Sequence, residues 1–367
     1  MSDLRVERLA DLLINYSLKV KKNDLVVIAG SVIAEPLIKE AMKAVMARGA
    51  HPTTRLAFEW QDELFFQMAA DHQLSFTNPF VLHQMEKMDK FLGVWAGENS
   101  KKLTTVDPAK IAKVSQARRP ISDIFSERDA SGSLQWVGTI YPAAGEAQDA
   151  EMGTEEWADF CYSACLCDKP NPAKRWKEVR DHQKEMVKFL EKAKIFRIQA
   201  EGTDLTLDCT GRRWINCCGE KNMPDGEVFT APIETATTGK IRYTVPTVYG
   251  GREVNDIELT FKAGKVVKNK AAKGGEILSA MIEQDAGAKI LGEFAIGTNF
   301  GIKNYTKNIL FDEKIGGTVH LALGRCYKEC GGTNESALHW DMICDLRQGG
   351  TLTADGKKIL VDGKILI

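Results

Sequence analysis

The sequence has little of several features that would point to a charged or apolar partner. Its 49 basic and 50 acidic residues give a net charge of −1, and residues of the two signs are interleaved. No overall field therefore draws the chain to nucleic acid or to an anionic membrane surface. The sequence also contains no apolar run of about 18 residues, the length that a membrane span requires. We expect neither nucleic acid nor a membrane among its partners.

The signs of a secreted protein are absent as well. The first five residues are not followed by the apolar region of a secretory signal. The nine cysteines are odd in number and scattered along the chain. This usage fits a reducing compartment better than a disulfide framework. We therefore expect a cytoplasmic protein.

The cysteine spacing does not indicate a structural zinc site. Cys161, Cys165 and Cys167 stand close together, and Cys217 and Cys218 follow later in the chain. The paired C-x2-C spacing that tetrahedral zinc sites favour is missing. Because free cysteine is often simply a small core residue, we interpret these residues as buried or half-buried thiols.

A phosphate-binding loop is missing too. Gly30 and Ser31 follow the first predicted strand, where a helix N-terminus would attract an anion. However, neither G-x-G-x-x-G nor G-x-x-x-x-G-K-[ST] is present. We interpret this point as a plain strand-to-helix turn with a serine cap.

What the sequence does contain is a two-part pattern. Its 367 residues, 44% hydrophobic and 27% charged, are typical of a soluble enzyme with two cores. Over residues 1–190, apolar strands alternate with amphipathic helices, which predicts an N-terminal α/β domain with a parallel-type sheet. The predicted helices cover residues 5–18, 31–48, 60–70 and 108–118, and the predicted strands cover residues 25–30, 53–58, 91–95 and 134–140.

The pattern changes in the second half. Turn-forming residues at 167–172 lead into a charged helix at 173–193, and short strand-like runs dominate afterwards. We expect residues 191–367 to form a mixed α+β, strand-rich catalytic domain. Its predicted strands include residues 196–200, 204–208, 239–245, 257–261 and 265–267, with a helix at 275–283 and short hairpins after residue 350.

Two glutamates stand out in this second domain. Glu227 follows a turn and precedes Val-Phe-Thr, so it is predicted to begin a strand. By itself it also fits a solvated strand edge, the commoner place for a lone glutamate. Glu293 has apolar neighbours and follows Gly292, and a glycine there permits close backbone approach beside a metal.

Two histidines lie further along, beside other polar groups. His320 stands in a β-branched apolar run, which predicts burial; a buried histidine more often satisfies a hydrogen bond than binds a metal. In an extended backbone His339 and Asp341 share one face, because side chains alternate with period two. That pair is either a bidentate corner for a divalent ion or a hydrogen-bonded pair without a metal.

Taken together, these residues predict a metal centre. Several carboxylates and two histidines supply enough oxygen and nitrogen donors for two divalent ions. Two such ions about 3.5–4 Å apart activate a bridging water and stabilise a tetrahedral oxyanion. Mixed histidine and carboxylate ligands suit Zn²⁺, Co²⁺ or Mn²⁺ rather than Ca²⁺.

The motifs around these residues resemble those of the M29 metallo-aminopeptidases, the aminopeptidase T and aminopeptidase S type. In chain order they are P-x-G-E-V-F-T-x-P, G-E-F-x-I-G-T-N, G-T-V-H-x-A-L-G and S-A-x-H-x-D. The resemblance spans the whole chain. Four motifs in one order form a specific signal, although each alone is weak.

The resemblance implies hydrolysis of the N-terminal bond of short peptides by a homodimer with an enclosed dinuclear site. Glu293 would bridge the two ions, and it would act in catalysis together with Tyr327, whose phenol would hydrogen-bond the developing oxyanion. Glu313 would be a further ligand or acid–base group. By motif match, the ligands are Glu227, Glu293, His320, His339 and Asp341.

Two other functions use the same observations. A mononuclear iron ring-cleaving dioxygenase on this scaffold would share the His-x-Asp corner, but it would not require Glu227 and Glu293. A non-catalytic binding protein would leave many buried ionisable groups without a role. We therefore expect the hydrolase, and metal stoichiometry separates the three.

Overall fold

The computed structural model describes residues 3–249 and 251–367. It divides into two compact units, the first made of Met1–Ala173 with Gly219–Pro224 and the second of Lys174–Cys218 with Asp225–Ile367. Helix α9 (Pro172–Leu190) therefore belongs to the second unit for almost its whole length. The domain boundary after residue 190, which the sequence suggested, stays a prediction.

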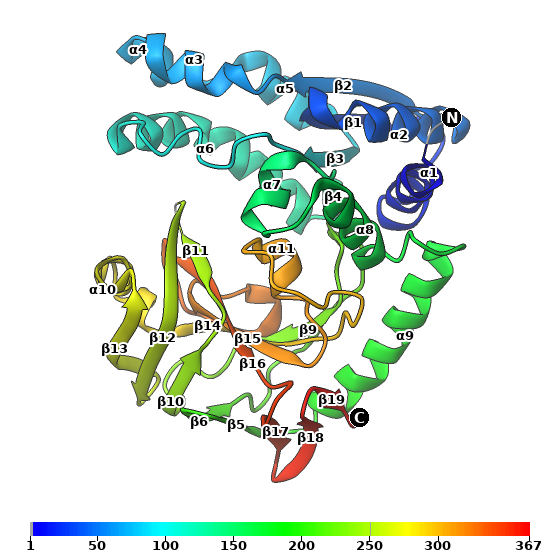
Figure 1. Cartoon of the computed structure of the whole chain (residues 1–367). Helices are drawn as coiled ribbons and strands as arrows, with labels where there is room; N and C mark the ends of the chain where they lie inside the picture. The colour runs from blue at the N-terminus through cyan, green and yellow to red at the C-terminus, as the bar shows by residue number, and fades with distance from the viewer. Residues whose placement is uncertain (1–2, 250) are drawn as a thin grey trace. The chain divides into compact units, whose positions relative to one another are not determined.

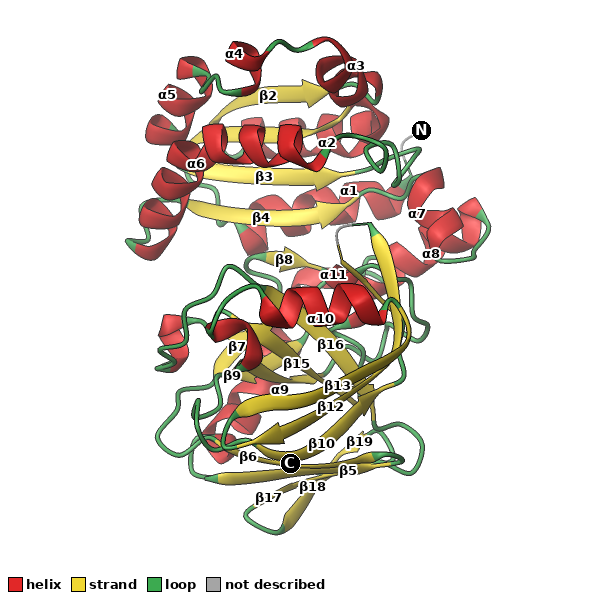
Figure 2. Ribbon diagram, turned by 90° about the vertical axis from the view of Figure 1, so that its left-hand side faces the viewer, coloured by secondary structure: helices red, strands yellow, loops and turns green. Residues whose placement is uncertain are grey.

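The first unit is built on a parallel sheet, as the alternating strands and helices predict. The strand order is β2-β1-β3-β4-β8, and Figure 2 shows β3 and β4 side by side in this sheet. The last strand comes from the segment that returns from the second unit, which the sequence did not predict. The strands are β1 Leu25–Ser31, β2 His51–Ala57, β3 Lys90–Trp95, β4 Gln135–Ile140 and β8 Asn222–Met223.

Helices cover both faces of this sheet. Met85 and Met88, at the end of α5, and residues of α6 pack with Val27 of β1 and Phe91 of β3, whereas α2 contacts β1 and β2. Right-handed crossovers to opposite sides of β1 require this arrangement. The helices are α1 Leu4–Asp11, α2 Glu35–Ala47, α3 Trp60–Met68, α4 Asp71–Leu74, α5 Pro79–Lys87, α6 Pro108–Ala130, α7 Ala144–Asp149 and α8 Thr154–Ala164, with a π-helical turn at Leu12–Ser17 and a 3-10 turn at Val32–Ala34.

Helix α6 is longer than predicted. The sequence predicts a helix over residues 108–118, but α6 runs on past Pro120, although proline inside a helix removes a hydrogen bond at a cost of about 3 kcal/mol. The helix continues to Ala130 because Ile121, Ile124 and Phe125 beyond the proline pack against the sheet. Within residues 3–249 and 251–367, no helix is long and apolar enough to cross a membrane.

The second unit is rich in antiparallel strands. A nine-stranded sheet follows the order β11-β12-β10-β6-β5-β17-β18-β19, with β13 paired to β12, and a five-stranded sheet follows β16-β15-β14-β9-β7 (Figure 1). Helices α10 (Gly275–Glu283) and α11 (Ile309–Asp312) complete it. The strands are β5 Ile195–Ala200, β6 Thr203–Asp208, β7 Ile215–Cys217, β9 Glu227–Thr230, β10 Thr238–Tyr243, β11 Thr247–Tyr249, β12 Arg252–Lys262, β13 Lys265–Lys273, β14 Leu291–Gly297, β15 Thr318–Gly324, β16 His339–Asp345, β17 Thr351–Ala354, β18 Lys357–Val361 and β19 Lys364–Ile365.

The five-stranded sheet has one apolar face and one polar face. Side chains alternate along a strand, so every second residue points to the same side. The apolar face joins the main core of the unit through residues such as Val228, Phe294, Leu321 and Met342. The other face therefore receives the intervening residues, and these include every predicted ligand on β9, β14, β15 and β16.

Candidate metal centre

Four neighbouring strands bring the predicted ligands together. Glu227 begins β9, Glu293 lies on β14, His320 on β15, and His339 and Asp341 on β16. Glu227, Glu293 and His320 are fully buried, as predicted for His320. Because β14 and β15 lie between β9 and β16, the side chains converge over the centre of the sheet.

Glu293 stands between the two histidines. Its Oε1 lies 3.4 Å from His320 Nε2, and its Oε2 lies 3.4 Å from His339 Nε2. His320 Nε2 is also 3.2 Å from Glu227 Oε2, and His339 Nε2 is 3.4 Å from Asp341 Oδ2. The donors thus form two groups of three that share Glu293 and offer ligand atoms within 4.8 Å of one another: Glu227–Glu293–His320 and Glu293–His339–Asp341.

On at least one neighbouring strand, a small residue lies opposite each of these ligands. Directly opposed side chains on antiparallel strands have Cβ atoms about 4.5–5.5 Å apart, so a large neighbour would fill the space above the sheet. The register places Gly297 opposite Glu227, Ala322 opposite both Glu293 and Asp341, Ala295 opposite His320, and Gly324 opposite His339. On the other neighbouring strand, Ile343 lies opposite His320 and Cys217 lies opposite Glu227.

Gly292 has a separate role beside Glu293. The pairing of β14 with β15 shifts at this point, so the backbones come close together. A Cβ atom on Gly292 would lie 2.4 Å from the carbonyl oxygens of both Gly324 and Arg325. The expected close approach of backbone is present, and it sets the position from which Glu293 projects.

Glu313 belongs to the same cluster. It follows α11, and its carboxylate can share a cation with His320 and Asp341, since their ligand atoms lie within 4.8 Å of one another. Burial first, and then the negative charge of Asp341, raise the pKa of Glu313, whereas Lys314 lowers it.

Lys314 is the member of the cluster that sequence reasoning missed. Its side chain is almost inaccessible to solvent, and its Nζ lies 2.5 Å from Glu227 Oε1 and 2.6 Å from Glu313 Oε1. Asp225 Oδ1 is 3.9 Å away. Burial lowers the pKa of this lysine, but the surrounding carboxylates raise it well above the usual value. In the sequence, Asp-Glu-Lys resembles a solvated turn, so nothing signals its burial.

Gln183 of α9 supports the site from behind. This buried side chain donates from Nε2 to the backbone oxygens of Cys217 and Glu227 and accepts at Oε1 from Thr298. It therefore ties α9 to β7, β9 and the residue that follows β14. Sequence reasoning missed it because a lone glutamine in a charged helix resembles a surface residue.

Tyr327 lies beside the cluster. Its ring packs against Phe229, with centroids 5.1 Å apart, and meets the ring of His339 edge-on at 5.3 Å. With 46% of its surface exposed, it is accessible to a substrate at the rim of the site. The predicted role as oxyanion donor stays a prediction, but the residue is within the neighbourhood that the role requires.

The cluster favours positive charge. Burial alone lowers the pKa of His320, but its hydrogen bond to Glu293 and the charge of Glu227 raise it to about 9. Burial also lowers the pKa of His339, but Asp341 and Glu293 outweigh this effect and raise the pKa to about 11. The carboxylates around the two imidazoles therefore make this cluster a favourable place for positive charge.

The donor set fits divalent metal ions. Oε2 of Glu227 and Oδ1 of Asp341 are buried, and neither has a hydrogen-bond partner in the described part of the chain. Carboxylate oxygens and imidazole nitrogens are ligands of zinc-type ions, and a bound ion would satisfy these orphaned atoms. The residues present therefore fit one or two such ions.

The cysteines play a smaller part. All nine are free thiols, and Cys217 is half-buried whereas the rest are buried. Cys217 is the one that approaches the cluster, where its sulfur shares a group with Asp225 and Glu227. Cys161, Cys165 and Cys167 lie in the first unit, and no group of metal donors among the described residues includes them.

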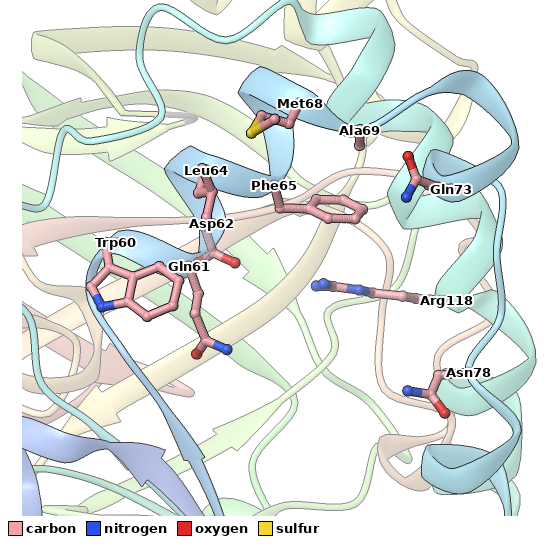
Figure 3. Close-up of a pocket in the computed structure, with 10 residues that line it drawn as sticks. All are labelled: Trp60, Gln61, Asp62, Leu64, Phe65, Met68, Ala69, Gln73, Asn78 and Arg118. Carbon is pink, nitrogen blue, oxygen red and sulfur yellow. The ribbon is translucent and has the colours of Figure 1, made fainter.

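A separate pocket of about 670 Å³ lies in the first unit (Figure 3). Trp60, Leu64, Phe65 and Met68 of α3 contribute apolar side chains to it, and Arg118 of α6 supplies a charge. The pocket contains none of the candidate ligands. Sequence reasoning did not single it out, because these apolar residues resemble a core-facing helix.

Known proteins resemble the chain over most or nearly all of its length. The family described as thermophilic metalloprotease (M29) matches residues 2–364. Aminopeptidase AmpS of Bacillus subtilis is 28% identical, over 95% of each chain. Aminopeptidase T of Thermus aquaticus is 25% identical, over 73% of this chain and 72% of that protein.

Two solved structures share the fold. Wild-type AmpT of Thermus thermophilus superposes with a TM-score of 0.87 at 23% identity, covering 99% of each chain. The 2,5-dihydroxypyridine dioxygenase of Pseudomonas putida KT2440 gives a TM-score of 0.57 at 13% identity, covering 98% of this chain and 96% of that one. The first match confirms the predicted architecture, a parallel α/β sheet followed by a strand-rich mixed unit.

Proposed function

Because the chain belongs to the M29 family of metalloproteases, we propose that it is an aminopeptidase that removes the N-terminal residue from short peptides with two divalent metal ions. The relatives in B. subtilis and T. aquaticus are named aminopeptidases. The five candidate ligands lie on one face of one sheet, where they would hold the ions without help from flexible loops.

One observation carries the dinuclear part of the proposal. The two oxygens of Glu293 face different histidines, each at 3.4 Å. A carboxylate in this position can bridge two ions, with Glu227 and His320 on one side and His339 and Asp341 on the other. A single-ion site would need only one of these two groups.

The proposed reaction uses these residues where they lie. Bound divalent ions supply Lewis acidity toward a scissile carbonyl and lower the pKa of a coordinated water. Tyr327 at the rim donates a hydrogen bond to the carbonyl oxygen as negative charge develops there. A carboxylate that does not bridge the ions, for which Glu313 is the candidate, would take the proton of the attacking water and pass it to the leaving amine. Carboxylates of the cluster whose oxygens are not occupied by the ions would hold the α-amine of the peptide.

The ligand types also bear on the metal. Oxygen from carboxylates with nitrogen from imidazoles suits Zn²⁺, Co²⁺ or Mn²⁺. Calcium prefers oxygen ligands throughout, which the two histidines do not supply. We therefore propose an ion from the first group, in a cytoplasmic enzyme.

A homodimer is part of the same proposal. Large apolar side chains are exposed on the first unit, among them Trp60 at 57%, Met68 at 76% and Phe80 at 84%. Two of these line the pocket in Figure 3. Exposed large apolar side chains are one feature of surfaces that contact other proteins, and a second copy of the chain is the partner that the proposal names.

Metal stoichiometry together with substrate cleavage tests the proposal. We expect two divalent ions per chain, and cleavage of leucyl amides and dipeptides. For Glu293→Gln we expect a loss of at least about 100-fold in kcat, because one of the two oxygens proposed to bridge the ions is replaced by an amide nitrogen that does not bind metal. One iron per chain with oxygen uptake on an aromatic substrate would favour the dioxygenase instead. Neither tight metal nor turnover would favour a binding protein.

A further inference from the structure

Lys314 is a buried cation among carboxylates. Its side chain is 2% exposed, and its ammonium contacts Glu227, Glu313 and Asp225 at 2.5, 2.6 and 3.9 Å. Burial of an ammonium is unfavourable unless the group is paired and hydrogen-bonded. The three carboxylates supply that pairing, so the ammonium and the acidic groups stabilise one another's charges in the interior.

Glu227 uses its two oxygens differently. Oε1 accepts a hydrogen bond from Lys314 Nζ at 2.5 Å. Oε2 faces His320 Nε2 at 3.2 Å, is buried, and accepts no hydrogen bond within the described residues. The lysine thus occupies one oxygen and turns the other toward the position between His320 and Glu293. Glu227 is thereby limited to one oxygen toward an ion.

The backbone holds the lysine in register with this glutamate. The Lys314 carbonyl accepts from the Asn299 amide at 2.9 Å, and the Lys314 amide donates to Phe311 at 3.0 Å. Asn299 in turn donates from Nδ2 to the Asp225 carbonyl at 2.8 Å. These hydrogen bonds connect the turn after α11 with the segment before β9. The backbone from which the Lys314 side chain extends is therefore held in place relative to Glu227.

The charges in the cluster match this assignment. Asp225, Glu227, Glu293, Glu313 and Asp341 carry five negative charges when ionised. Two divalent ions and one ammonium carry five positive charges. Without the lysine, the two ions would have to balance one further carboxylate, and Glu227 would be free to turn both oxygens to one ion.

We propose that Lys314 is a positioning residue, which fixes Glu227 as a one-oxygen ligand and so sets the affinity of the ion between Glu227 and His320. This inference rests on the proposed two-ion site and adds to it a residue outside the predicted ligand set. The loss of an outer partner of a metal ligand typically costs about 10–100-fold in affinity.

The test measures binding of metal alone to the apoprotein. Co²⁺ and Zn²⁺ are titrated into the unmodified protein, Lys314→Met and Lys303→Met, in competition with a chromophoric chelator, and the visible Co²⁺ spectrum is recorded. Lys303 is exposed in the same unit and is the matched control. We expect two ions in the unmodified protein and the control. In Lys314→Met we expect one ion bound as before and the other weakened about 10–100-fold.

A double variant separates position from charge. Lys314→Met with Asp225→Asn restores the net charge but not the bond to Glu227, with Asp225→Asn alone as its reference. The proposal expects the second ion to remain weakened. Recovery of full affinity would overturn it, because Lys314 would then only balance charge, and so would unchanged binding in folded Lys314→Met.

Two further outcomes are also decisive. If Lys314→Met does not fold by circular dichroism, Lys314→Gln takes its place, since its shorter neutral amide cannot reach Glu227 in the same way, and the same weakening is expected. If the unmodified protein binds one ion, the two-ion proposal fails. The inference on Lys314 is then supported when the lysine variant weakens that ion and refuted when it does not.

Discussion

Replacement of Ala322 by valine tests whether the small residues on the sheet keep room for metal. Ala322 is fully buried on β15 and lies opposite both Glu293 and Asp341. Opposed Cβ atoms are about 5 Å apart, and each added methyl extends about 1.5 Å from the Cβ. A methyl turned toward either carboxylate then lies at about van der Waals distance from the facing side chain. The space for an ion between these ligands would be lost.

Ala322→Val should lower stability modestly and should lower metal content and kcat strongly. Overpacking of a buried position costs about 1–3 kcal/mol, so Ala322→Val should remain folded with a lower urea midpoint. Metal content should fall from two ions to one or none, and kcat should fall by about 100-fold or more. Metal analysis, urea unfolding and leucyl-amide turnover on the same preparation measure all three.

Ala354→Val is the matched control. Ala354 is also buried, but it lies on β17 and packs in the main core of the second unit. It should lose a similar amount of stability and keep its metal. If Ala322→Val retains two ions at unchanged affinity, the reasoning from the strand register is wrong.

Two other outcomes are expected. Tyr327→Phe should keep its metal content and lower kcat by about 100–1000-fold, the usual effect of removing one oxyanion donor; an unchanged kcat would remove Tyr327 from the reaction. Asp345 concerns stability rather than catalysis: burial raises its pKa, but hydrogen bonds from Arg347 and Tyr305 outweigh this and lower it. A lowered folded pKa stabilises the protein above the unfolded value of about 3.9, and this stability is lost as pH falls through the folded pKa. In urea unfolding, the unmodified protein should therefore have a larger free energy of unfolding than Asp345→Asn at neutral pH, and this difference should disappear in acid. A difference that does not change with pH would contradict this.

The face on which each candidate ligand lies was predictable because it depends on a short-range rule. Alternation along one strand is enough to place His339 and Asp341 on the same face, and a β-branched run is enough to bury His320. The order of β9, β14, β15 and β16 is not visible in any single segment. Here the resemblance to a family supplied what the spacing could not, because only a whole-chain pattern links motifs that are far apart.

The parts that sequence reasoning missed depend on long-range contacts. Lys314 is buried because Glu227 and Asp225, far away in sequence, lie beside it, and no local pattern records that. Strand β8 has two residues and acquires its structure from β4, so it has no periodicity of its own. The extension of α6 past Pro120 likewise depends on a sheet that the helix sequence does not contain.

The two faces of the five-stranded sheet have a consequence for how the centre arises during folding. Shifting a strand by one residue turns all its side chains over. On β15 that shift would bring Val319 and Leu321 to the polar face and turn His320 toward the apolar core. The free-energy cost of such a shift comes from the misplaced apolar side chains, and it does not depend on a bound ion. The apolar residues of the interior therefore also determine which residues of β15 face the candidate metal centre.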